Sequence, residues 1–184
     1  MQADFDYILF TQEQIAARVR ELAGDISRTY ADAETDLTLV TILSGSLIFL
    51  ADLIRELPIR MRIGLITVSS YRGPTTQPGD PRVFTPQELD VHGRHVLVLD
   101  DILDTGNTLR TVRAQLSKSS PLSIRTCVLL RKLSKAPADV PADFVGFDIR
   151  EDDFVVGYGL DYNDLYRNAP MIGVLKPDLY RTDR

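Results

Sequence analysis

The sequence predicts an α/β fold, in which an open, twisted parallel sheet is flanked by helices. Apolar segments of strand length alternate along the chain with segments whose apolar residues recur at helical spacing. Residues 96–99 form the continuous apolar run Val-Leu-Val-Leu, which is typical of a parallel strand buried on both faces. Polar turns follow two of the predicted strands, at the sheet edge where ligands bind in open α/β folds.

The first half of the chain opens with a helix signal. Residues 11–14, Thr-Gln-Glu-Gln, have the pattern of a capping box, and an apolar face follows at positions 15, 19, 22 and 26. Residues 37–43 predict a strand, a Ser-Gly-Ser turn leads into a helix that ends at Leu57, and residues 62–69 predict the next strand. Residues 71–83 contain three prolines and two glycines and predict a mobile loop. This loop is either a lid over the carboxyl edge of the sheet or a variable surface loop.

The second half continues the alternation. Residues 86–93 predict a turn or short hairpin into the strand at 95–99, and a helix is expected from about 106 to 118. Further strands are predicted at 123–130, 143–147, 154–158 and 171–175. We expect the tail from Lys176 to be partly frayed. His92 and His95 are interpreted as surface turn residues.

The composition of the chain argues against several classes of function. The chain has 184 residues, is 44% hydrophobic and 26% charged, and carries a net charge of -5, so no basic field favours nucleic acid. Its apolar runs are too short to cross a membrane, and its first residues lack the pattern of a signal peptide. The single cysteine, Cys127, lies in a predicted buried strand and excludes an intrachain disulfide, so we expect a cytoplasmic protein.

Three carboxylates, Asp100, Asp101 and Asp104, stand within five positions after the buried strand. Residues 104–108, Asp-Thr-Gly-Asn-Thr, then form a turn whose hydroxyls, glycine and free N–H groups can hold a phosphate. The acids suit sugar hydroxyls or Mg²⁺ instead. Helix capping by Thr105 or Asn107 is the simpler alternative, but it does not account for all three acids. The combination indicates a phosphorylated sugar as the ligand.

Residues 96–109, VLVLDDILDTGNTL, resemble the phosphoribosyl pyrophosphate signature of the type I phosphoribosyltransferases. No Gly-Lys-Ser or Gly-Lys-Thr sequence occurs, so this is not a Walker loop. The resemblance extends discontinuously from 43 to 167 and is densest at 96–109 and 154–163. It implies the type I fold, with a small hood built from the N- and C-terminal segments, in a single domain over residues 1–184.

The resemblance is strongest to the hypoxanthine-guanine branch of this family, and it implies roles on the donor side. The turn from Asp104 to Thr108, with Thr105, Gly106 and Asn107, would hold the 5′-phosphate, while Asp100 and Asp101 would accept from the ribose hydroxyls that also face Mg²⁺. Ser44 and Gly45 match the pyrophosphate loop, although the branch usually has Lys where this chain has Ser44. Arg167 matches an arginine that contacts pyrophosphate, and Asp161 would lie near a magnesium-bound water. Ser70 and Tyr71 match the head of the catalytic lid.

The acceptor side is implied by two further segments. Lys132, at the end of a buried strand, would donate to a purine 6-oxo group and reject a 6-amino group; Arg131 is a competitor one position away. Phe154 would stack on the purine, and Val155 would offer backbone groups to its Watson–Crick edge. Asp104 is the candidate general base, acting at purine N7.

The resemblance therefore implies a magnesium-dependent enzyme of purine salvage. It would join hypoxanthine or guanine to phosphoribosyl pyrophosphate, giving IMP or GMP and pyrophosphate, and it would form a homodimer or homotetramer with no nucleic-acid or membrane partner. Two alternatives stay open: an enzyme that prefers xanthine or hypoxanthine alone, and an RNA-binding regulator with the same fold.

Overall fold

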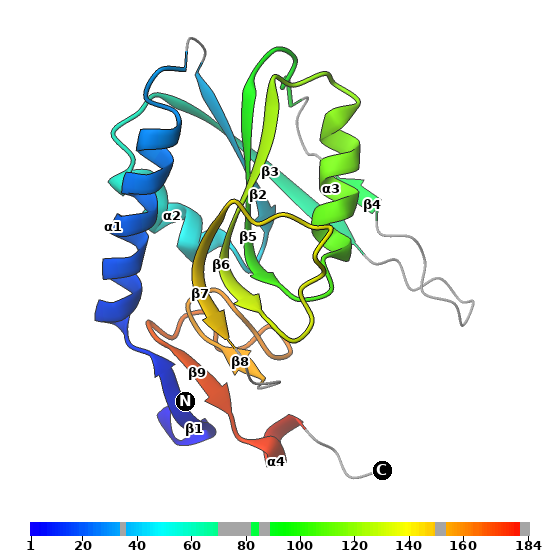
Figure 1. The fold of residues 1–184 in the computed structure, drawn as a ribbon. Helices are drawn as coiled ribbons and strands as arrows, with labels where there is room; N and C mark the ends of the chain where they lie inside the picture. The colour runs from blue at the N-terminus through cyan, green and yellow to red at the C-terminus, as the bar shows by residue number, and fades with distance from the viewer. Residues whose placement is uncertain (34–35, 70–81, 85–88, 150–153, 181–184) are drawn as a thin grey trace, which may run out of the picture.

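A computed structural model describes residues 1–33, 36–69, 82–84, 89–149 and 154–180 (Figure 1). Its main sheet has the strand order β4-β3-β2-β5-β6-β7. Five of these strands run parallel: β2 (Leu37–Leu43), β3 (Met61–Ser69), β5 (His95–Leu103), β6 (Ser123–Lys132) and β7 (Phe144–Ile149). The predicted parallel sheet is confirmed.

The sixth strand departs from the sequence prediction. Residues Arg82–Phe84 form β4, which pairs antiparallel with the end of β3. The prediction of a loop over 71–83 was therefore wrong at its last two residues. The short, β-branched and aromatic sequence Arg-Val-Phe follows Pro81, and an edge position tolerates a strand that begins directly after a proline.

Helices cover both faces of the main sheet. Helices α1 (Gln12–Thr29) and α2 (Leu47–Glu56) lie on one face, and α3 (Asn107–Ser117) lies on the other (Figure 1). The central strand β5 is buried on both sides: Leu97 and Leu99 belong to the apolar layer under α1 and α2, whereas Val96 and Val98 belong to the layer under α3. Side chains of a strand alternate between faces, which explains the continuous apolar run.

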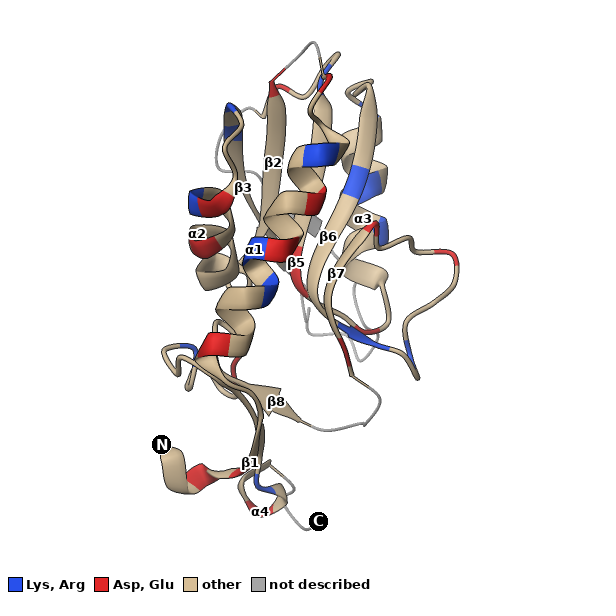
Figure 2. Ribbon diagram, turned by 60° about the vertical axis from the view of Figure 1, so that its left-hand side comes forward, with Lys and Arg blue, Asp and Glu red and all other residues tan. Residues whose placement is uncertain are grey.

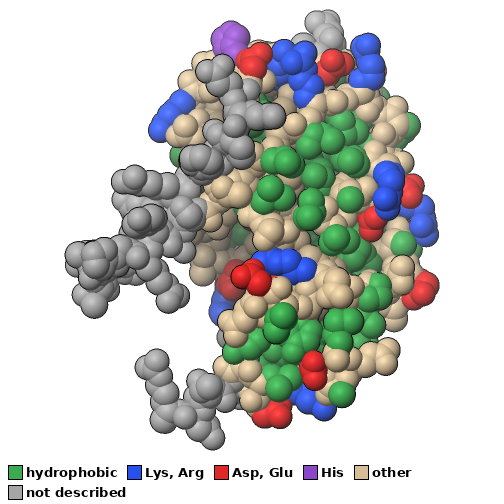
Figure 3. All heavy atoms as spheres, turned by 180° about the vertical axis from the view of Figure 1, so that it is seen from behind, with side chains coloured by type: hydrophobic (Ala, Val, Ile, Leu, Met, Phe, Trp, Pro, Cys, Tyr) green, Lys and Arg blue, Asp and Glu red, His purple; other side chains and the backbone are tan. Residues whose placement is uncertain are grey.

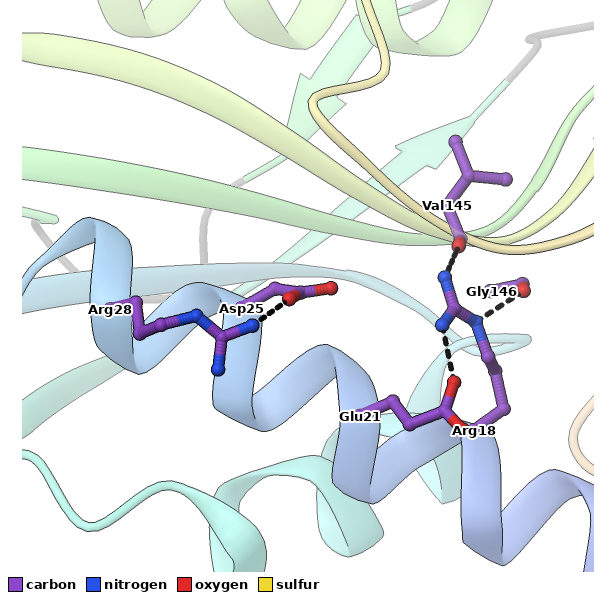
Figure 4. A network of polar contacts seen from close by, with 6 residues as sticks. All are labelled: Arg18, Glu21, Asp25, Arg28, Val145 and Gly146. Carbon is purple, nitrogen blue, oxygen red and sulfur yellow. Dashed lines mark hydrogen bonds and ion pairs between the residues drawn. The ribbon is translucent and has the colours of Figure 1, made fainter.

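Helix α1 begins as its sequence predicts. Thr11 and Gln14 form a complete capping box, and the buried face consists of Ile15, Val19, Leu22, Ala23 and Ile26. Arg18 joins the helix to the outer strand β7: its guanidinium donates to the carbonyls of Gly146 at 2.7 Å and Val145 at 2.9 Å, and it pairs with Glu21 (Figure 4). The edge of the sheet is thus tied to α1.

A second, antiparallel sheet of order β1-β9-β8 forms the predicted hood. Its strands are β1 (Phe5–Phe10), β8 (Val155–Val156) and β9 (Ile172–Leu175), next to the short η1 (Gln2–Asp4) and α4 (Pro177–Tyr180). The sheet lies below the carboxyl ends of β6 and β7 in Figure 1. The strand predicted at 154–158 is only two residues long, because Gly157 and Gly159 have φ of 101° and turn the chain.

Three smaller expectations are decided by local contacts. The tail expected to fray from Lys176 is held where it begins, since Lys176 donates to the carbonyls of Ala3 and Asp4, and its last residues, 181–184, lie outside the described residues. His95 is half-buried and bonded to Ser123 at 2.8 Å, and is not a surface turn residue. Cys127 is buried in β6 as expected. Within the described ranges, no helix has the length and apolar character needed to cross a membrane.

Candidate active site

A cavity of about 290 Å³ opens at the carboxyl end of β2, β3 and β5. Eight of the residues predicted from the sequence line it. They are Gly45, Asp100, Asp101, Asp104, Thr105, Gly106, Asn107 and Thr108. The structure therefore gathers the residues of both polar turns, one after β2 and one after β5, around a single cavity.

The turn after β5 presents backbone N–H groups to this cavity. Helix α3 starts after Gly106, which has φ 73° in the left-handed region, and no side chain caps the helix. The alternative that Thr105 or Asn107 acts as a simple N-cap was therefore wrong. The first N–H groups of a helix have no partner within it, so they and the helix dipole suit an anion here.

The connection between β6 and β7 closes over Gly106, a feature that sequence reasoning missed. A Cβ added at Gly106 would lie 2.8 Å from Val140 and 2.9 Å from Pro137, and Arg110 of α3 holds this connection through two bonds to Asp139 at 2.9 and 3.0 Å. Glycine is thus required both by the backbone conformation and by the close approach of this segment.

Asp100 and Asp101 share the end of β5 in a poorly solvated place. Asp100 is only 6% exposed, and its Oδ1 accepts from the backbone N–H of Asp101 at 3.1 Å. Burial, followed by the negative charge of Asp101, raises the pKa of Asp100 well above its usual range, and burial also raises the pKa of Asp101. Such an arrangement is relieved by a ligand that brings hydroxyl donors or a cation.

Asp104 and Lys132 come from neighbouring strands. The register of β5 and β6 pairs Leu103 with Arg131, so the next residue of each strand lies at the same edge. Lys132 is buried, and its Nζ lies 3.8 Å from Oδ2 of Asp104. The other oxygen of Asp104, Oδ1, is buried and has no hydrogen-bond partner among the described residues. A buried acceptor without a partner is rare in proteins and calls for a donor from a ligand or a water molecule.

Arg131, the competitor of Lys132, is paired with a residue of β7. Its guanidinium makes a two-point contact with Asp148 of β7, with Nε at 2.7 Å and Nη2 at 3.0 Å. Consecutive residues of a strand point to opposite faces. Lys132 alone of the two therefore approaches Asp104.

The turn after β2 is packed against both the acids and the hood. The Leu43–Ser44 peptide is cis, and Ser44 is exposed. A Cβ added at Gly45 would lie 1.6 Å from Oδ2 of Asp101, and one added at Gly159 would lie 2.0 Å from the carbonyl oxygen of Gly45. Only glycine permits three segments to meet this closely.

The hood loop after β8 adds charged groups to this corner. Arg167 donates to the carbonyl of Gly159 at 2.8 Å and pairs with Asp161 at 2.8 Å and Asp164 at 3.1 Å. The positive charge of Arg167 lowers the pKa of Asp101 and offsets part of the effect of burial. Arg167 is thus close enough to the acidic pair to influence it electrostatically.

Phe154 and Val155 lie in the hood rather than on the main sheet. Val155 is buried on β8, the outer strand of the hood sheet, where it pairs with Val174. The Phe154 ring contacts Tyr162 edge-on at 5.4 Å and stacks with Tyr180 at 4.9 Å between ring centroids. Ser70 and Tyr71, predicted at the head of a lid, lie outside the described residues.

One further contact that the sequence did not reveal joins the hood to α2. The hydroxyl of Tyr158 donates to Oδ2 of Asp52 at 2.6 Å, and burial together with this carboxylate raises the pKa of Tyr158. Asp52 and Tyr158 are 106 positions apart. No local pattern predicts such a pair.

Comparison with known proteins decides the family. The phosphoribosyl transferase domain model matches residues 8–163. The chain belongs to the phosphoribosyltransferase family. It is 41% identical over 182 residues to the hypoxanthine-guanine phosphoribosyltransferase of Mycobacterium tuberculosis, covering 97% of this chain and 90% of that protein. It is 40% identical over 166 residues to the hypoxanthine phosphoribosyltransferase of Escherichia coli K12, covering 90% and 93%.

Solved structures agree with this assignment. The chain superposes on a hypoxanthine phosphoribosyltransferase from Staphylococcus aureus with a TM-score of 0.90 and 37% identity, covering 99% of this chain and 97% of that one. The fold expected from the sequence, a parallel sheet flanked by helices, is thus that of the phosphoribosyltransferases. The hypoxanthine-guanine branch, implied by the segments at 43–47, 70–71, 132 and 154–163, is also the branch to which the names of these relatives point.

Asp100 and Asp101 fit the Mg²⁺ ion that the family resemblance implies. Asp161 is engaged by Arg167 and by the N–H of Asp164, and the described residues contain no cluster of three or more metal-binding side chains. Mg²⁺ commonly takes one or two carboxylates and completes its shell with water and substrate oxygens. Asp100 and Asp101, with their raised pKa values, are carboxylates that a cation would stabilise.

Proposed function

We propose that this phosphoribosyltransferase moves the 5-phosphoribosyl group from phosphoribosyl pyrophosphate to a 6-oxopurine, hypoxanthine or guanine, in purine salvage. The observation that carries the proposal is the position of Asp104. One of its oxygens faces Lys132 and the other is a buried acceptor without a partner among the described residues, beside the turn that opens α3. A hydrogen-bond donor, a proton acceptor and a turn suited to phosphate are thus adjacent.

The donor would bind in the cavity between the two turns. The N–H groups of residues 105–108 and the hydroxyls of Thr105 and Thr108 would hold the 5′-phosphate, and Asp100 and Asp101 would accept from the ribose hydroxyls. The pyrophosphate would lie toward Gly45, Ser44 and Arg167. Ser44 supplies backbone contacts but not the positive charge that a lysine would provide at this position.

The acceptor would lie between the hood and the end of β6. Lys132 would donate to the 6-oxo group, Phe154 would stack on the purine ring, and the backbone of Val155 would meet the Watson–Crick edge. As the bond from purine N9 to C1′ forms, the bond from C1′ to pyrophosphate breaks and its electron pair leaves with the pyrophosphate. Oδ1 of Asp104 would take the proton from N7, so that charge does not build up on the purine.

Mg²⁺ would be held by the ribose and pyrophosphate oxygens together with Asp100 and Asp101, with Asp161 near a water of its shell. Bound there, it would neutralise the negative charge of the departing pyrophosphate. The chain's own net charge of -5 makes such neutralisation more important, because the substrate is a polyanion.

The RNA-binding alternative is not favoured. Acidic and basic residues are interspersed along the ribbon in Figure 2, without a continuous basic stripe. The relatives reported above are named as phosphoribosyltransferases. A preference for hypoxanthine alone, as in the name of the E. coli relative, or for xanthine is an outcome of the activity test below.

We also propose that the protein forms a homodimer or homotetramer through an apolar surface on α2 and β3. Leu47 and Ile48 of α2 and Ile63 and Leu65 of β3 are exposed by 37–49%. Figure 3 shows apolar side chains gathered on the face turned away from the viewer in Figure 1. Light scattering should give a multiple of 20.6 kDa for the wild type and a lower mass for Leu65→Glu. A monomeric wild type would contradict this proposal.

The activity test uses the purified protein with phosphoribosyl pyrophosphate, Mg²⁺ and, separately, hypoxanthine, guanine, xanthine, adenine and uracil. Nucleotide formation with hypoxanthine and guanine is expected, and ribose 5-phosphate in place of the donor is the control. Activity with adenine or uracil alone would contradict the proposed role of Lys132. No nucleotide with any base would contradict the proposed function.

A further inference from the structure

The C-terminal helix α4 places a third aromatic ring against the proposed purine platform. The ring of Tyr180 stacks on Phe154, with 4.9 Å between centroids and 27° between planes. Tyr162 meets the same Phe154 ring edge-on, at 86°. These distances are those of favourable aromatic pairs. Tyr180 therefore covers one face of the Phe154 ring.

Tyr180 is held in this place by the start of the chain and by β9. Lys176, which precedes α4, is fixed by bonds from its backbone N–H to the carbonyl of Asp4 at 3.0 Å and from Nζ to the carbonyl of Ala3 at 2.7 Å. The backbone N–H of Leu175 donates to the carbonyl of Phe154 at 2.9 Å. The segment that carries Tyr180 is thus anchored, directly before α4, to the start of the chain and to Phe154.

A phenyl ring has two faces, and Tyr180 covers one of them. A purine that stacks on Phe154 must then use the other face. A backed ring keeps one rotamer, so less side-chain entropy is lost when the purine binds. We propose that Tyr180 is a positioning residue for the purine, which acts by backing Phe154. This inference rests on the proposed function, because it assumes that Phe154 stacks on the base.

The test compares Tyr180→Ala with Tyr180→Phe in the full-length chain. Loss of the ring should raise KM for hypoxanthine by about three- to tenfold, an effect of the size expected for one aromatic pair, and leave KM for phosphoribosyl pyrophosphate unchanged. Tyr180→Phe keeps the stacked ring and should restore the wild-type KM. Leu179→Ala, in the same turn and 40% exposed, is the matched control and should change neither constant.

A double-mutant cycle with Phe154→Leu separates backing from a merely structural role. If Tyr180 acts through the Phe154 ring, Tyr180→Ala should have no further effect on KM for hypoxanthine in the Phe154→Leu background. An equal effect in both backgrounds would overturn the inference. So would an unchanged KM in Tyr180→Ala, or a lower one, which would mean that Tyr180 occupies the face used by the purine.

The two proposals can fail separately. If the wild type forms no nucleotide from any purine, the proposed function fails. If the wild type is active but Tyr180→Ala has a wild-type KM for hypoxanthine, the inference about Tyr180 fails alone. Melting temperatures of all variants identify any that do not fold, and for these Tyr180→Leu, which retains apolar bulk without a ring, replaces Tyr180→Ala.

Discussion

Nζ of Lys132 lies 3.8 Å from Oδ2 of Asp104, between the ends of two neighbouring parallel strands. In the proposed reaction, Lys132 would donate to one edge of the purine and Asp104 would accept a proton from another. The register of β5 and β6 aligns Leu103 with Arg131, so Asp104, the first residue after β5, lies beside Lys132, the last residue of β6.

Lys132→Met should weaken discrimination between 6-oxo and 6-aminopurines. The loss of a buried donor is expected to lower kcat/KM for hypoxanthine about 5- to 150-fold, which corresponds to roughly 1–3 kcal/mol. No matching loss is expected for adenine. Arg131→Met is the matched control, because Arg131 is engaged with Asp148. The ratio of the two kcat/KM values is measured for each variant, and a change in Arg131→Met instead would reassign the donor.

Asp104→Asn should lower turnover much more than substrate binding. The amide has nearly the same shape but does not accept the N7 proton, so kcat is expected to fall by about 10²- to 10⁴-fold. Both KM values should stay within a few-fold of wild type. Asp139→Asn, which removes a carboxylate on the neighbouring connection, is the control. Near-full activity in Asp104→Asn would show that another group accepts the proton.

Asp100→Asn should make the protein more stable and less active. The raised pKa of Asp100 means that the folded state disfavours its ionised form. An unfolded Asp100 ionises around its ordinary value of 3.8, so the wild type loses stability relative to the variant as pH rises from there toward the folded-state pKa. Above that pKa the difference is constant.

The expected gain for Asp100→Asn at pH 7 is on the order of 1 kcal/mol, or about 2–4 °C in melting temperature. Thermal unfolding of both proteins from pH 4 to pH 8 measures it. If the melting temperatures of the variant and the wild type differ as much at pH 4 as at pH 8, ionisation of Asp100 is not the cause of the difference.

The donor side of the site could be predicted from the sequence more fully than the acceptor side. Asp100, Asp101 and the turn at 104–108 are adjacent in sequence, so a local pattern was sufficient to place them together. Lys132 could be placed because parallel strands end at one edge. The competitor Arg131 could not be judged from the sequence, because its ion pair with Asp148 depends on the position of the next strand.

Contacts between distant segments account for what the sequence did not reveal. The bond from Tyr158 to Asp52 and the close approach of Gly159 to Gly45 depend on how the hood lies against the main sheet. The closure of Pro137 and Val140 over Gly106 depends on a proline-containing connection without periodicity. Neither arrangement is set by local propensity, and both follow from packing.

Arg18→Met should lower stability clearly, whereas Arg28→Met should not. Arg18 donates to two carbonyls of β7, and bonds from charged donors are worth about 1.5–3 kcal/mol. Arg28 pairs with Asp25 on the exposed side of the same helix, where ion pairs contribute roughly 0–1 kcal/mol (Figure 4). Urea unfolding of both variants measures the difference, and equal losses would contradict the role of Arg18 at the sheet edge.

The pairing of β1 with β9 has a consequence for how the enzyme is made. Phe5 lies opposite Leu175, so β1 can pair only after β9 has been synthesised. A chain emerging from the ribosome contains β2, β3 and β5, with the turns that follow β2 and β5, long before the hood sheet can form. Translation that stops before β9 therefore leaves β1 without its partner and the hood sheet incomplete.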